Sequence, residues 1–274
     1  MIIIDHHQPT LNLNNWKDDG EILHINPHFT PSIVPFPDPS NYCACKITYD
    51  IVNSFSDIGD RSPFIAAGII GDFSENAWPE FMGEVYKKYP REEILKLADV
   101  LSVFSHGGSD PYITYLALQE SDTFGEILEG KTRYSDQIMR EYSDLVQERN
   151  SIASRFDNEA DIDRETKLCI FQIDSKKFLA SEVANIISRR MPSYTHVVIQ
   201  IHDGTAKAKA RNQFGTVDVA KMLRTITPVV GGDAGGHSKA SGSEFPTEKI
   251  EEYINLIKRY VKEKNQDREI LGSS

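Results

Sequence analysis

The 274-residue sequence lacks long apolar runs, and no stretch approaches the roughly 20 residues that a membrane-spanning helix needs. It also lacks a basic segment ahead of an apolar core near its start, so we predict no signal peptide and expect a cytoplasmic protein. Cysteine is scarce, with three residues, which is typical of a reducing compartment. Because Cys43-x-Cys45 has no second Cys or His pair nearby, we do not expect a zinc site there.

The sequence is also short of basic charge. Its 30 Lys and Arg residues face 41 Asp and Glu residues, for a net charge of −11. This balance argues against a protein that coats nucleic acid, although a nuclease with local positive charge stays possible. Residues 205–224 concentrate basic side chains against a single acidic one, Asp218: Lys207, Lys209, Arg211, Lys221 and Arg224. This segment is either a solvated strand face or a patch that contacts phosphates.

Length and ordinary composition predict one large or two medium domains. Residues 2–4 are all isoleucine, which favours a strand buried on both faces of a parallel sheet. Helical spacing of apolar residues predicts helices over 43–55, 91–104 and 132–156. The acidic segment 157–165 is interpreted as a linker between domains.

The periodicity changes after this segment. Strands are predicted at 168–173, 195–202 and 205–211. Asp203-Gly204 is predicted as the turn between the last two strands, and Ser181 as the cap of a helix. An amphipathic helix is expected after Pro246, with a frayed end at 267–274.

Two short motifs carry side chains suited to metal chemistry. Asp5-His6-His7 follows the first strand, and ligands in open α/β sheets bind at the carboxyl ends of strands. One carboxylate and two imidazoles could hold Mn²⁺, Mg²⁺ or Zn²⁺. Asp72 ends the apolar Gly68–Asp72 motif and could join the same site. The alternatives are two loop histidines without a partner, and a helix or strand that simply ends at an aspartate.

A third motif is rich in glycine. Residues 231–242 hold five glycines together with His237, and glycines expose backbone N–H groups that can cradle phosphates or carboxylates. A histidine in such a loop adds a donor for the same anion. The alternative is a flexible linker.

Together these residues resemble the DHH phosphoesterase superfamily, in which a DHH domain precedes a DHHA1 domain, and they are most similar to archaeal RecJ-like proteins. Ser109-Asp110-Pro111-Tyr112 also looks like that archaeal group. The other matching positions are Asp5-His6-His7, Asn26-Pro27, Gly68 to Asp72, Lys209 and Arg211 on a basic strand, and Gly235, Gly236, His237, Ala240 and Gly242.

The resemblance implies an α/β fold, with a partial parallel-sheet DHH domain joined by a helix to a smaller α/β DHHA1 domain. The expected boundaries are 1–131 for the DHH part, 132–165 for the connection, 166–266 for DHHA1 and 267–274 for the tail. An intact family site would hold two Mn²⁺ or Mg²⁺ ions. It implies Asp5, His6 and His7 as catalytic residues, and His6, Asp72 and Asp5 as metal ligands. Substrate-binding residues would be His7, Lys209, Arg211, Gly235, Gly236, His237 and Ser238.

One departure concerns the start of the chain. The family's first aspartate motifs precede the Asp-His-His triplet, but here four residues precede Asp5. We therefore expect that about 100 residues of the family's DHH domain are missing, a length that suits the absent strands and helices. The metal site would then be incomplete, the activity impaired and the first strand an exposed edge.

Three hypotheses about function follow from the resemblance. The first is a metal-dependent phosphodiesterase or exonuclease that acts on single-stranded DNA or RNA, with a role in DNA repair. The second is a phosphoesterase for small nucleotides: oligoribonucleotides, cyclic dinucleotides or phosphoadenosine phosphate. The third is a non-catalytic replisome scaffold that binds the GINS complex. The archaeal-type segment 109–112 favours the first hypothesis, and none involves a membrane.

Overall fold

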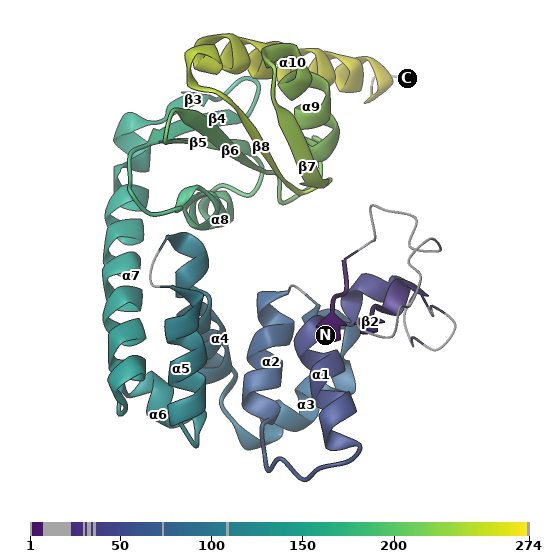
Figure 1. The fold of residues 1–274 in the computed structure, drawn as a ribbon. Helices are drawn as coiled ribbons and strands as arrows, with labels where there is room; N and C mark the ends of the chain where they lie inside the picture. The colour runs from purple at the N-terminus through teal and green to yellow at the C-terminus, as the bar shows by residue number, and fades with distance from the viewer. Residues whose placement is uncertain are drawn as a thin grey trace. The chain divides into compact units, whose positions relative to one another are not determined.

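The computed structural model describes residues 2–7, 23–29, 31, 34, 37–72, 74–107 and 110–272, with side chains up to residue 265 (Figure 1). The chain divides into two compact units. Unit 1 comprises Met1–Phe104 and Ser109–Tyr142, and unit 2 comprises Ser105–Gly108 and Ser143–Ser274. Within the described part of the chain, no helix is both long and apolar enough to cross a membrane. The archaeal-type segment begins at Ser109, which lies outside the described residues.

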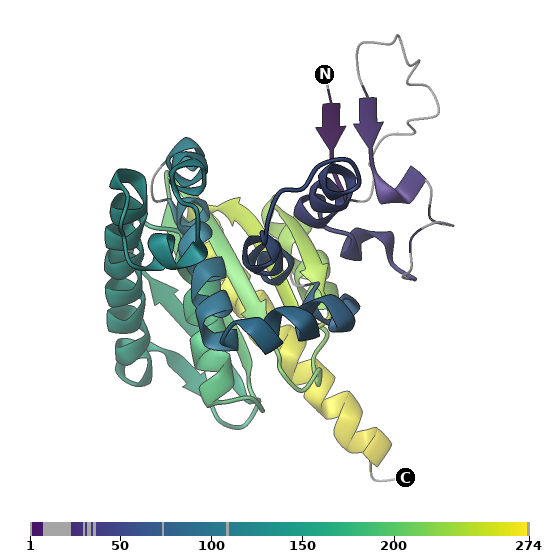
Figure 2. The same ribbon diagram turned by 90° about the horizontal axis from the view of Figure 1, so that it is seen from below.

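Unit 1 begins with a parallel pair of strands, β1 (Ile2–Ile4) and β2 (Leu23–Ile25), with Ile3 opposite His24 (Figure 2). The predicted strand and its parallel pairing are confirmed. The predicted burial on both faces is wrong, since Ile2 is 67% exposed and Leu23 is 54% exposed. In the described residues this sheet has two strands, which are too few to bury both faces.

The rest of unit 1 is helical. The predicted helix at 43–55 is confirmed over Ala44–Asn53. The predicted helix at 91–104 is confirmed over Arg91–Leu101. The apolar run before Asp72 is also a helix, α2. Its surface is apolar on nearly every side because it packs into two separate apolar clusters. Ala67 belongs to one cluster and Ile69 to the other. The helices are α1 (Ala44–Asn53), α2 (Ser62–Gly71), α3 (Pro79–Lys88), α4 (Arg91–Leu101), α5 (Pro111–Glu120) and α6 (Phe124–Leu128).

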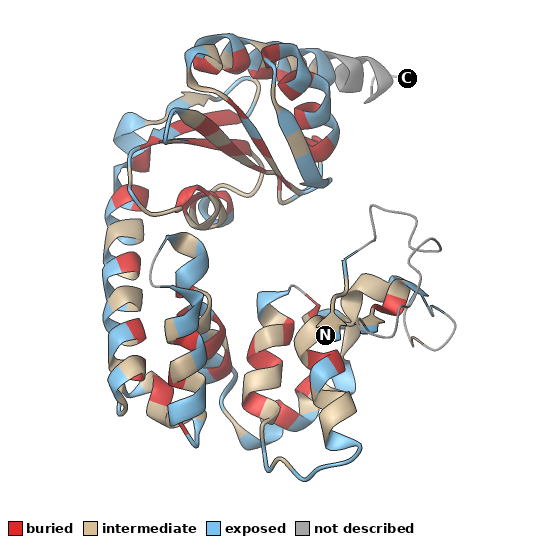
Figure 3. Cartoon of the chain, viewed as in Figure 1, coloured by how far each residue is buried: buried red, intermediate tan, exposed pale blue. Residues whose placement is uncertain are grey.

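Helix α7 (Arg133–Glu159) is the predicted long polar helix, and the change between units at Tyr142 falls within it. Its buried residues recur along one side, including Ile138, Leu145, Ile152 and Phe156 (Figure 3). This stripe packs into an apolar cluster of unit 1 at Ile138 and against Phe171 of unit 2 at Phe156. The boundaries predicted for the domains stay predictions.

Unit 2 is built on a six-stranded sheet with the order β3-β4-β5-β6-β8-β7. Strands β4 and β5 are parallel, and the other neighbours are antiparallel. All three predicted strands are confirmed, and Asp203-Gly204 lies between β5 and β6 as predicted. The strands are β3 (Asp161–Asp163), β4 (Leu168–Ile173), β5 (Thr195–His202), β6 (Thr205–Arg211), β7 (Asp233–His237) and β8 (Ala240–Pro246).

Two interpretations of the sequence need correction here. The acidic segment 157–165 is not wholly a linker, because β3 pairs Asp161 with Ile170 of β4. The glycine-rich segment is not a loop either. It forms the β7–β8 hairpin, in which Gly235 lies opposite Gly242, and β7 is the last strand of the sheet.

Helices cover both faces of this sheet. Helices α9 (Val219–Ile226) and α10 (Ile250–Gly272) pack on one face, where the alanines of β6 join their apolar side chains in the core. Helix α8 (Ala180–Arg190) lies against β5 and β6. Its residues Asn185 and Ser181 bind Arg211, whose side chain emerges on the other face of β6 from the alanines. Helix α10 runs past the predicted end at 266, and Ser273 and Ser274 lie outside the described residues.

The start of α8 corrects one further prediction. Ser181 does not cap this helix, which begins at Ala180. The amide oxygen of Gln200 on β5 instead accepts hydrogen bonds from the backbone N–H groups of Leu179 and Ala180, each at 3.1 Å. The side-chain amide of Gln200 donates to the carbonyl of Ser175 at 2.9 Å. Gln200 therefore accepts hydrogen bonds from the first backbone N–H groups of α8, which in other helices bind a capping residue next to the helix.

Candidate functional site

The Asp5-His6-His7 triplet forms a tight turn directly after β1. One carboxylate oxygen of Asp5 accepts hydrogen bonds from the backbone N–H of His6 at 2.8 Å and of His7 at 3.2 Å. The same oxygen lies 2.8 Å from Nδ1 of His7. Hydrogen bonding from the His7 side chain lowers the pKa of Asp5. Asp5 therefore organises the turn and orients the His7 ring, whose side chain is otherwise 79% exposed.

Asn26 follows β2 and is brought beside the triplet by the parallel pairing of β1 with β2. It is 4% exposed. Its amide nitrogen donates to the carbonyl of His7 at 3.1 Å and lies 3.5 Å from the second carboxylate oxygen of Asp5. Its amide oxygen accepts from the backbone N–H of His28 at 2.9 Å. Asn26 thus holds the triplet in place through its backbone as well as its side chain.

The His6 ring is held at both nitrogens. Nδ1 lies 2.8 Å from the carbonyl oxygen of Ser40, and Nε2 lies 3.1 Å from a carboxylate oxygen of Asp72. A carbonyl can only accept, so Nδ1 carries the hydrogen. In the neutral ring the lone pair of Nε2 then faces a carboxylate, which leaves two acceptors in contact. The arrangement is favourable only with a proton or a metal ion between Nε2 and the carboxylate oxygen.

Asp72 reaches this position because it is the first residue after α2. Its backbone N–H donates to the carbonyl of Gly68 at 3.1 Å, which continues the last turn of the helix. Burial raises the pKa of Asp72, and the neighbouring charges of His6 and His7 oppose that rise. A carboxylate whose side chain is 34% exposed and faces an imidazole nitrogen is a favourable ligand for a divalent ion.

The structure arranges the predicted metal ligands as two adjacent pairs. His6 contacts Asp72, Asp5 contacts His7, and the two imidazole rings are 4.5 Å apart between centroids. Among the residues that the structure describes, no group of three His, Cys, Asp or Glu side chains is placed to hold a metal ion. The chemistry of the His6–Asp72 pair fits part of the coordination of one divalent ion, and the described residues do not form a two-ion site.

A second candidate site lies on the sheet of unit 2. Lys207, Lys209 and Arg211 alternate with buried alanines on β6 and therefore share one face of the sheet. A shallow depression of about 370 Å³ lies there, lined by Lys207, Lys209 and residues of the β7–β8 hairpin that include Gly235 and Gly242. We call this surface the basic face.

Glycine at position 242 shapes the basic face. Gly242 lies opposite Lys209 in the β6–β8 ladder, and a Cβ atom there would be 2.9 Å from Lys209 Nζ. The missing side chain lets the ammonium group lie across β8. Burial, together with the charges of Arg211 and Lys207, lowers the pKa of Lys209. Asp233 and Glu244 line the same depression, and Glu244 lies 3.6 Å from Lys207. Lys209 therefore supplies the positive charge of this surface that is least balanced by a carboxylate, and an anion beside it would relieve the repulsion from Lys207 and Arg211.

Arg211 is less available than its neighbours. Its Nε donates to the amide oxygen of Asn185 at 2.8 Å, and its Nη2 donates to Ser181 Oγ at 2.9 Å. Nη1 donates to the carbonyl of Ala210 at 3.0 Å. The guanidinium group therefore fastens α8 to β6, and its predicted contact with substrate stays a prediction.

The predicted hairpin residues occupy distinct positions. Gly236 accepts a hydrogen bond from Arg224 at its carbonyl, at 3.3 Å, and His237 is the exposed last residue of β7. The carbonyl of Ser238 accepts from the backbone N–H of Val219 at 2.9 Å, which ties the hairpin turn to the start of α9. Strand β7 is at the sheet edge, where alternate backbone N–H groups have no neighbouring strand.

The sequence did not predict the groups that hold His6 and Asp72 in position. Ser40 acts through its backbone carbonyl, and no side-chain pattern predicts such a contact. The contact of Cys45 Sγ with Gly68 was also missed, although a glycine within an apolar helix is a signal of close packing.

Comparisons with known proteins show what the chain and its fold are similar to. Residues 165–263 match the DHHA1 domain family. RecJ from Thermus thermophilus, solved in complex with Mg²⁺, is 14% identical with a TM-score of 0.64, over 96% of this chain and 42% of that one. An exonuclease RecJ bound to manganese is 15% identical with a TM-score of 0.55, over 95% of this chain and 68% of that one.

A DHH-domain protein described as a member of a family of ribosomal proteins is 17% identical with a TM-score of 0.58. The match covers 95% of this chain and 63% of that one, so the chain spans less than two thirds of this relative and of the Thermus RecJ. No curated protein matches the sequence. At these identities the structural matches establish the fold, and they confirm the predicted α/β architecture. Residues 165–263 thus match the DHHA1 domain model, in a chain whose fold is similar to that of the RecJ structures.

Proposed function

We propose that the protein is a metal-dependent phosphodiesterase that removes nucleotides from the end of single-stranded DNA or RNA. The observation that carries the proposal is the His6–Asp72 pair, in which Nε2 lies 3.1 Å from a carboxylate oxygen, a spacing that a cation between the two atoms would stabilise. Such a pair attracts a cation, and a divalent cation is the usual means of activating water for attack on a phosphodiester. Members of the superfamily are generally phosphoesterases.

In this proposal His6 and Asp72 hold a Mn²⁺ or Mg²⁺ ion, as the Mg²⁺ and manganese complexes of the RecJ relatives suggest. When bound, such an ion lowers the pKa of a coordinated water and withdraws electrons from a phosphoryl oxygen. Ser40 orients His6 through its carbonyl. Asp5 orients His7, whose Nε2 is left to donate to a phosphate oxygen when the ring is protonated. Asp5 is thus a positioning residue.

The basic face supplies the other requirement, an affinity for phosphates. Its ammonium groups lie beside Gly235 and Gly242, which have no side chains. A sugar-phosphate backbone can therefore approach this surface closely. Contacts of this kind carry no information about base sequence. The proposal therefore predicts binding without sequence preference, with Lys209 as the main phosphate contact.

The test is calorimetric titration of the protein with Mn²⁺, followed by an assay of nucleotide release from an end-labelled single strand. We expect Mn²⁺ binding, and both binding and release should be lost in Asp72→Asn. The matched control is Asp60→Asn, because Asp60 is a carboxylate of unit 1 that pairs with Lys88, away from His6. Equal Mn²⁺ affinity in Asp72→Asn and wild type would contradict the proposal.

The length of the substrate separates this proposal from a small-nucleotide phosphoesterase. The rate at subsaturating substrate should rise from dinucleotides to longer strands, because each additional phosphate adds a possible contact with a basic side chain. Highest efficiency on dinucleotides, cyclic dinucleotides or phosphoadenosine phosphate would instead favour the small-nucleotide function.

A second candidate function is a non-catalytic scaffold, for which the GINS complex would be the partner. The specific observation that favours it is the lack of a three-residue metal-binding group among the described side chains. A scaffold of this kind does not need the cation between His6 and Asp72. Titration of the wild-type protein with Mn²⁺ without any heat of binding would support the scaffold and exclude the phosphodiesterase.

A further inference from the structure

Two cysteines lie in contact at the start of α1. Cys43 is the residue before the helix and Cys45 lies in its first turn, and their sulfur atoms are 3.3 Å apart. At this distance one thiol donates a hydrogen bond to the other sulfur. Residues two apart in a chain are separated by at most about 7 Å, and near a helix start by less, which is within reach of a disulfide.

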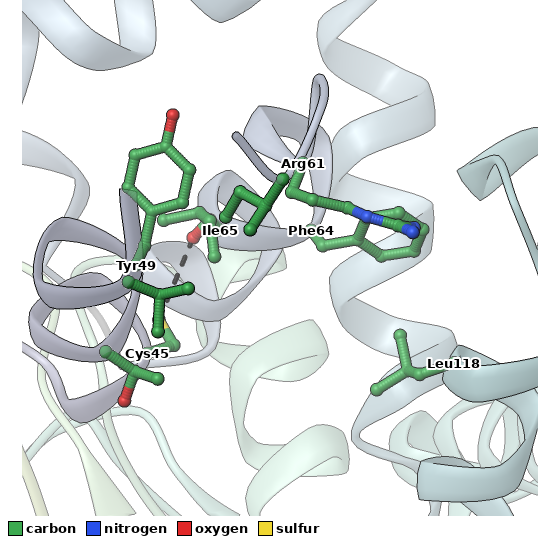
Figure 4. A pocket seen from close by; sticks show the side chains of 9 residues that line it. Cys45, Tyr49, Arg61, Phe64, Ile65 and Leu118 are labelled. Carbon is green, nitrogen blue, oxygen red and sulfur yellow. Dashed lines mark hydrogen bonds between the residues drawn. The ribbon is translucent and has the colours of Figure 1, made fainter. Parts of the chain in front are cut away.

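The two sulfurs differ in their access to solvent. Cys43 is 1% exposed, whereas Cys45 is partly exposed and lines an apolar pocket of about 410 Å³ (Figure 4). Tyr49, Phe64 and Leu118 are among the other residues that line this pocket. A small reagent that enters it therefore meets Cys45 first, and Cys43 can react only through Cys45.

The thiols also differ in acidity. Hydrogen bonding from Cys45 lowers the pKa of Cys43 to about 7, while hydrogen bonding to Cys43 and burial raise the pKa of Cys45. The pair therefore shares one proton near neutral pH. Disulfides form when a thiolate attacks a sulfur atom, so thiol–disulfide exchange requires one deprotonated cysteine. Two touching sulfur atoms that share one proton meet this requirement.

We propose that Cys43 and Cys45 form a reversible disulfide by exchange with a small-molecule disulfide such as oxidised glutathione. The Cys43 thiolate first accepts the proton of the touching Cys45 thiol, and the Cys45 sulfur then attacks a glutathione sulfur. The glutathione S–S bond breaks, a mixed disulfide forms and one glutathione leaves. The Cys43 thiolate then attacks Cys45 Sγ and expels the second glutathione. Two protein sulfur atoms are oxidised and one small disulfide is reduced. One released glutathione takes up the proton of the cysteine pair, and the other takes a proton from solvent.

The disulfide would act on the supports of His6 and Asp72. Cys45 Sγ lies against Gly68, where a Cβ atom would be 2.4 Å away, and the Gly68 carbonyl holds the backbone N–H of Asp72. Cys43 follows Ser40, whose carbonyl holds His6, by three residues. Shortening the sulfur separation from 3.3 Å to about 2.05 Å therefore moves an atom that lies against Gly68 and a residue that is three positions from Ser40 in the chain. Because the bond closes a loop over a single residue, it adds little chain-entropy stabilisation and should be readily reduced.

The test is incubation of the folded chain with oxidised glutathione, followed by intact mass and peptide mapping. We expect the protein to become lighter by two hydrogen atoms through a link between Cys43 and Cys45, and dithiothreitol to reverse the change. Cys169 is the third cysteine and is buried, so Cys169→Ala should behave as wild type. Cys43→Ala should stop at a glutathione adduct on Cys45.

A persistent adduct on wild-type Cys45, or three free thiols under conditions that modify Cys43→Ala, would overturn the proposal. The coupling to His6 has its own readout, which does not depend on metal binding or catalysis. The imidazole NMR signals of His6, assigned with His6→Gln, should shift reversibly on oxidation. Unchanged signals in the oxidised protein would refute the coupling.

Discussion

The two candidate sites are built in different ways. The basic face takes its geometry from a six-stranded sheet, in which every position of β6 is paired with β5 and β8. The His6–Asp72 pair depends on single contacts: one carbonyl of Ser40, one carboxylate of Asp5 and one carbonyl of Gly68. A sheet holds side chains at fixed spacing whatever their identity, whereas a turn between short elements holds them only while each contact persists. Substitutions should therefore separate function from stability more cleanly on the sheet.

The largest expected effect concerns the sheet core itself. Phe171 is fully buried and meets Phe156 of α7 with ring centroids 5.6 Å apart. Phe171→Ala should destabilise unit 2 by about 3–5 kcal/mol, because it removes apolar burial and leaves a cavity. Both tryptophans, Trp16 and Trp78, precede residue 104, so tryptophan fluorescence reports on unit 1 alone. In denaturant, circular dichroism should show an early transition that fluorescence does not follow.

The control for this variant is Phe214→Ala, because Phe214 also lies in unit 2 but is 63% exposed. It should change stability by no more than about 0.5 kcal/mol. If Phe171→Ala instead shifts the fluorescence and dichroism transitions equally, the two units unfold together and the comparison between them loses its basis.

A smaller effect is expected from Lys209→Gln, which removes one cation from the basic face without altering the backbone ladder. Affinity for a single-stranded oligonucleotide should fall roughly three- to tenfold, and the slope of log affinity against log salt should decrease in magnitude by about 0.7. Binding would be measured by fluorescence anisotropy at several salt concentrations. Lys262→Gln, an exposed lysine of α10, is the control. An unchanged slope in Lys209→Gln would show that this ammonium group does not contact phosphate.

The smallest effect concerns the stability of unit 1. Because burial raises the pKa of Asp72, its ionised carboxylate costs folding free energy above the raised pKa, and this cost is absent below the ordinary value of 3.8. Asp72→Asn, which resembles the protonated form, should be at least as stable as wild type at pH 7 without metal. The difference should disappear as the pH falls below 3.8. Thermal unfolding across this range is the measurement, and a less stable variant at pH 7 would show that pairing with His6 outweighs burial.

The sequence predicted unit 2 in more detail than unit 1, for a physical reason. Strand 205–211 follows a period of two, strand 195–202 is buried over most of its length, and a turn dipeptide lies between them. Local pattern and tertiary structure therefore agree. The glycine-rich segment was assigned to a loop because glycine disfavours strands. In the structure, Gly242 has a strand position because the side chain of Lys209 occupies the space beside it.

In unit 1 the motifs predicted which residues meet but not what holds them. The proximity of His6 to Asp72 was expected, while their supports are a backbone carbonyl and a helix end that leave no pattern in the sequence. The exposure of Ile2 could not be predicted from three isoleucines, because burial depends on how many strands pair beside them. The grouping of Asp5 with His7 instead of Asp72 likewise follows from the tightness of one turn.

The hydrogen bonds of Gln200 have a consequence for the order in which unit 2 folds. The first backbone N–H groups of α8 bind a side chain 20 residues further along the chain. A nascent chain that has not yet added β5 therefore has an α8 whose start lacks its partner, and the helix gains that partner only when the strand docks. The helix and the strand thus become stable together, so this part of unit 2 folds in a single cooperative step.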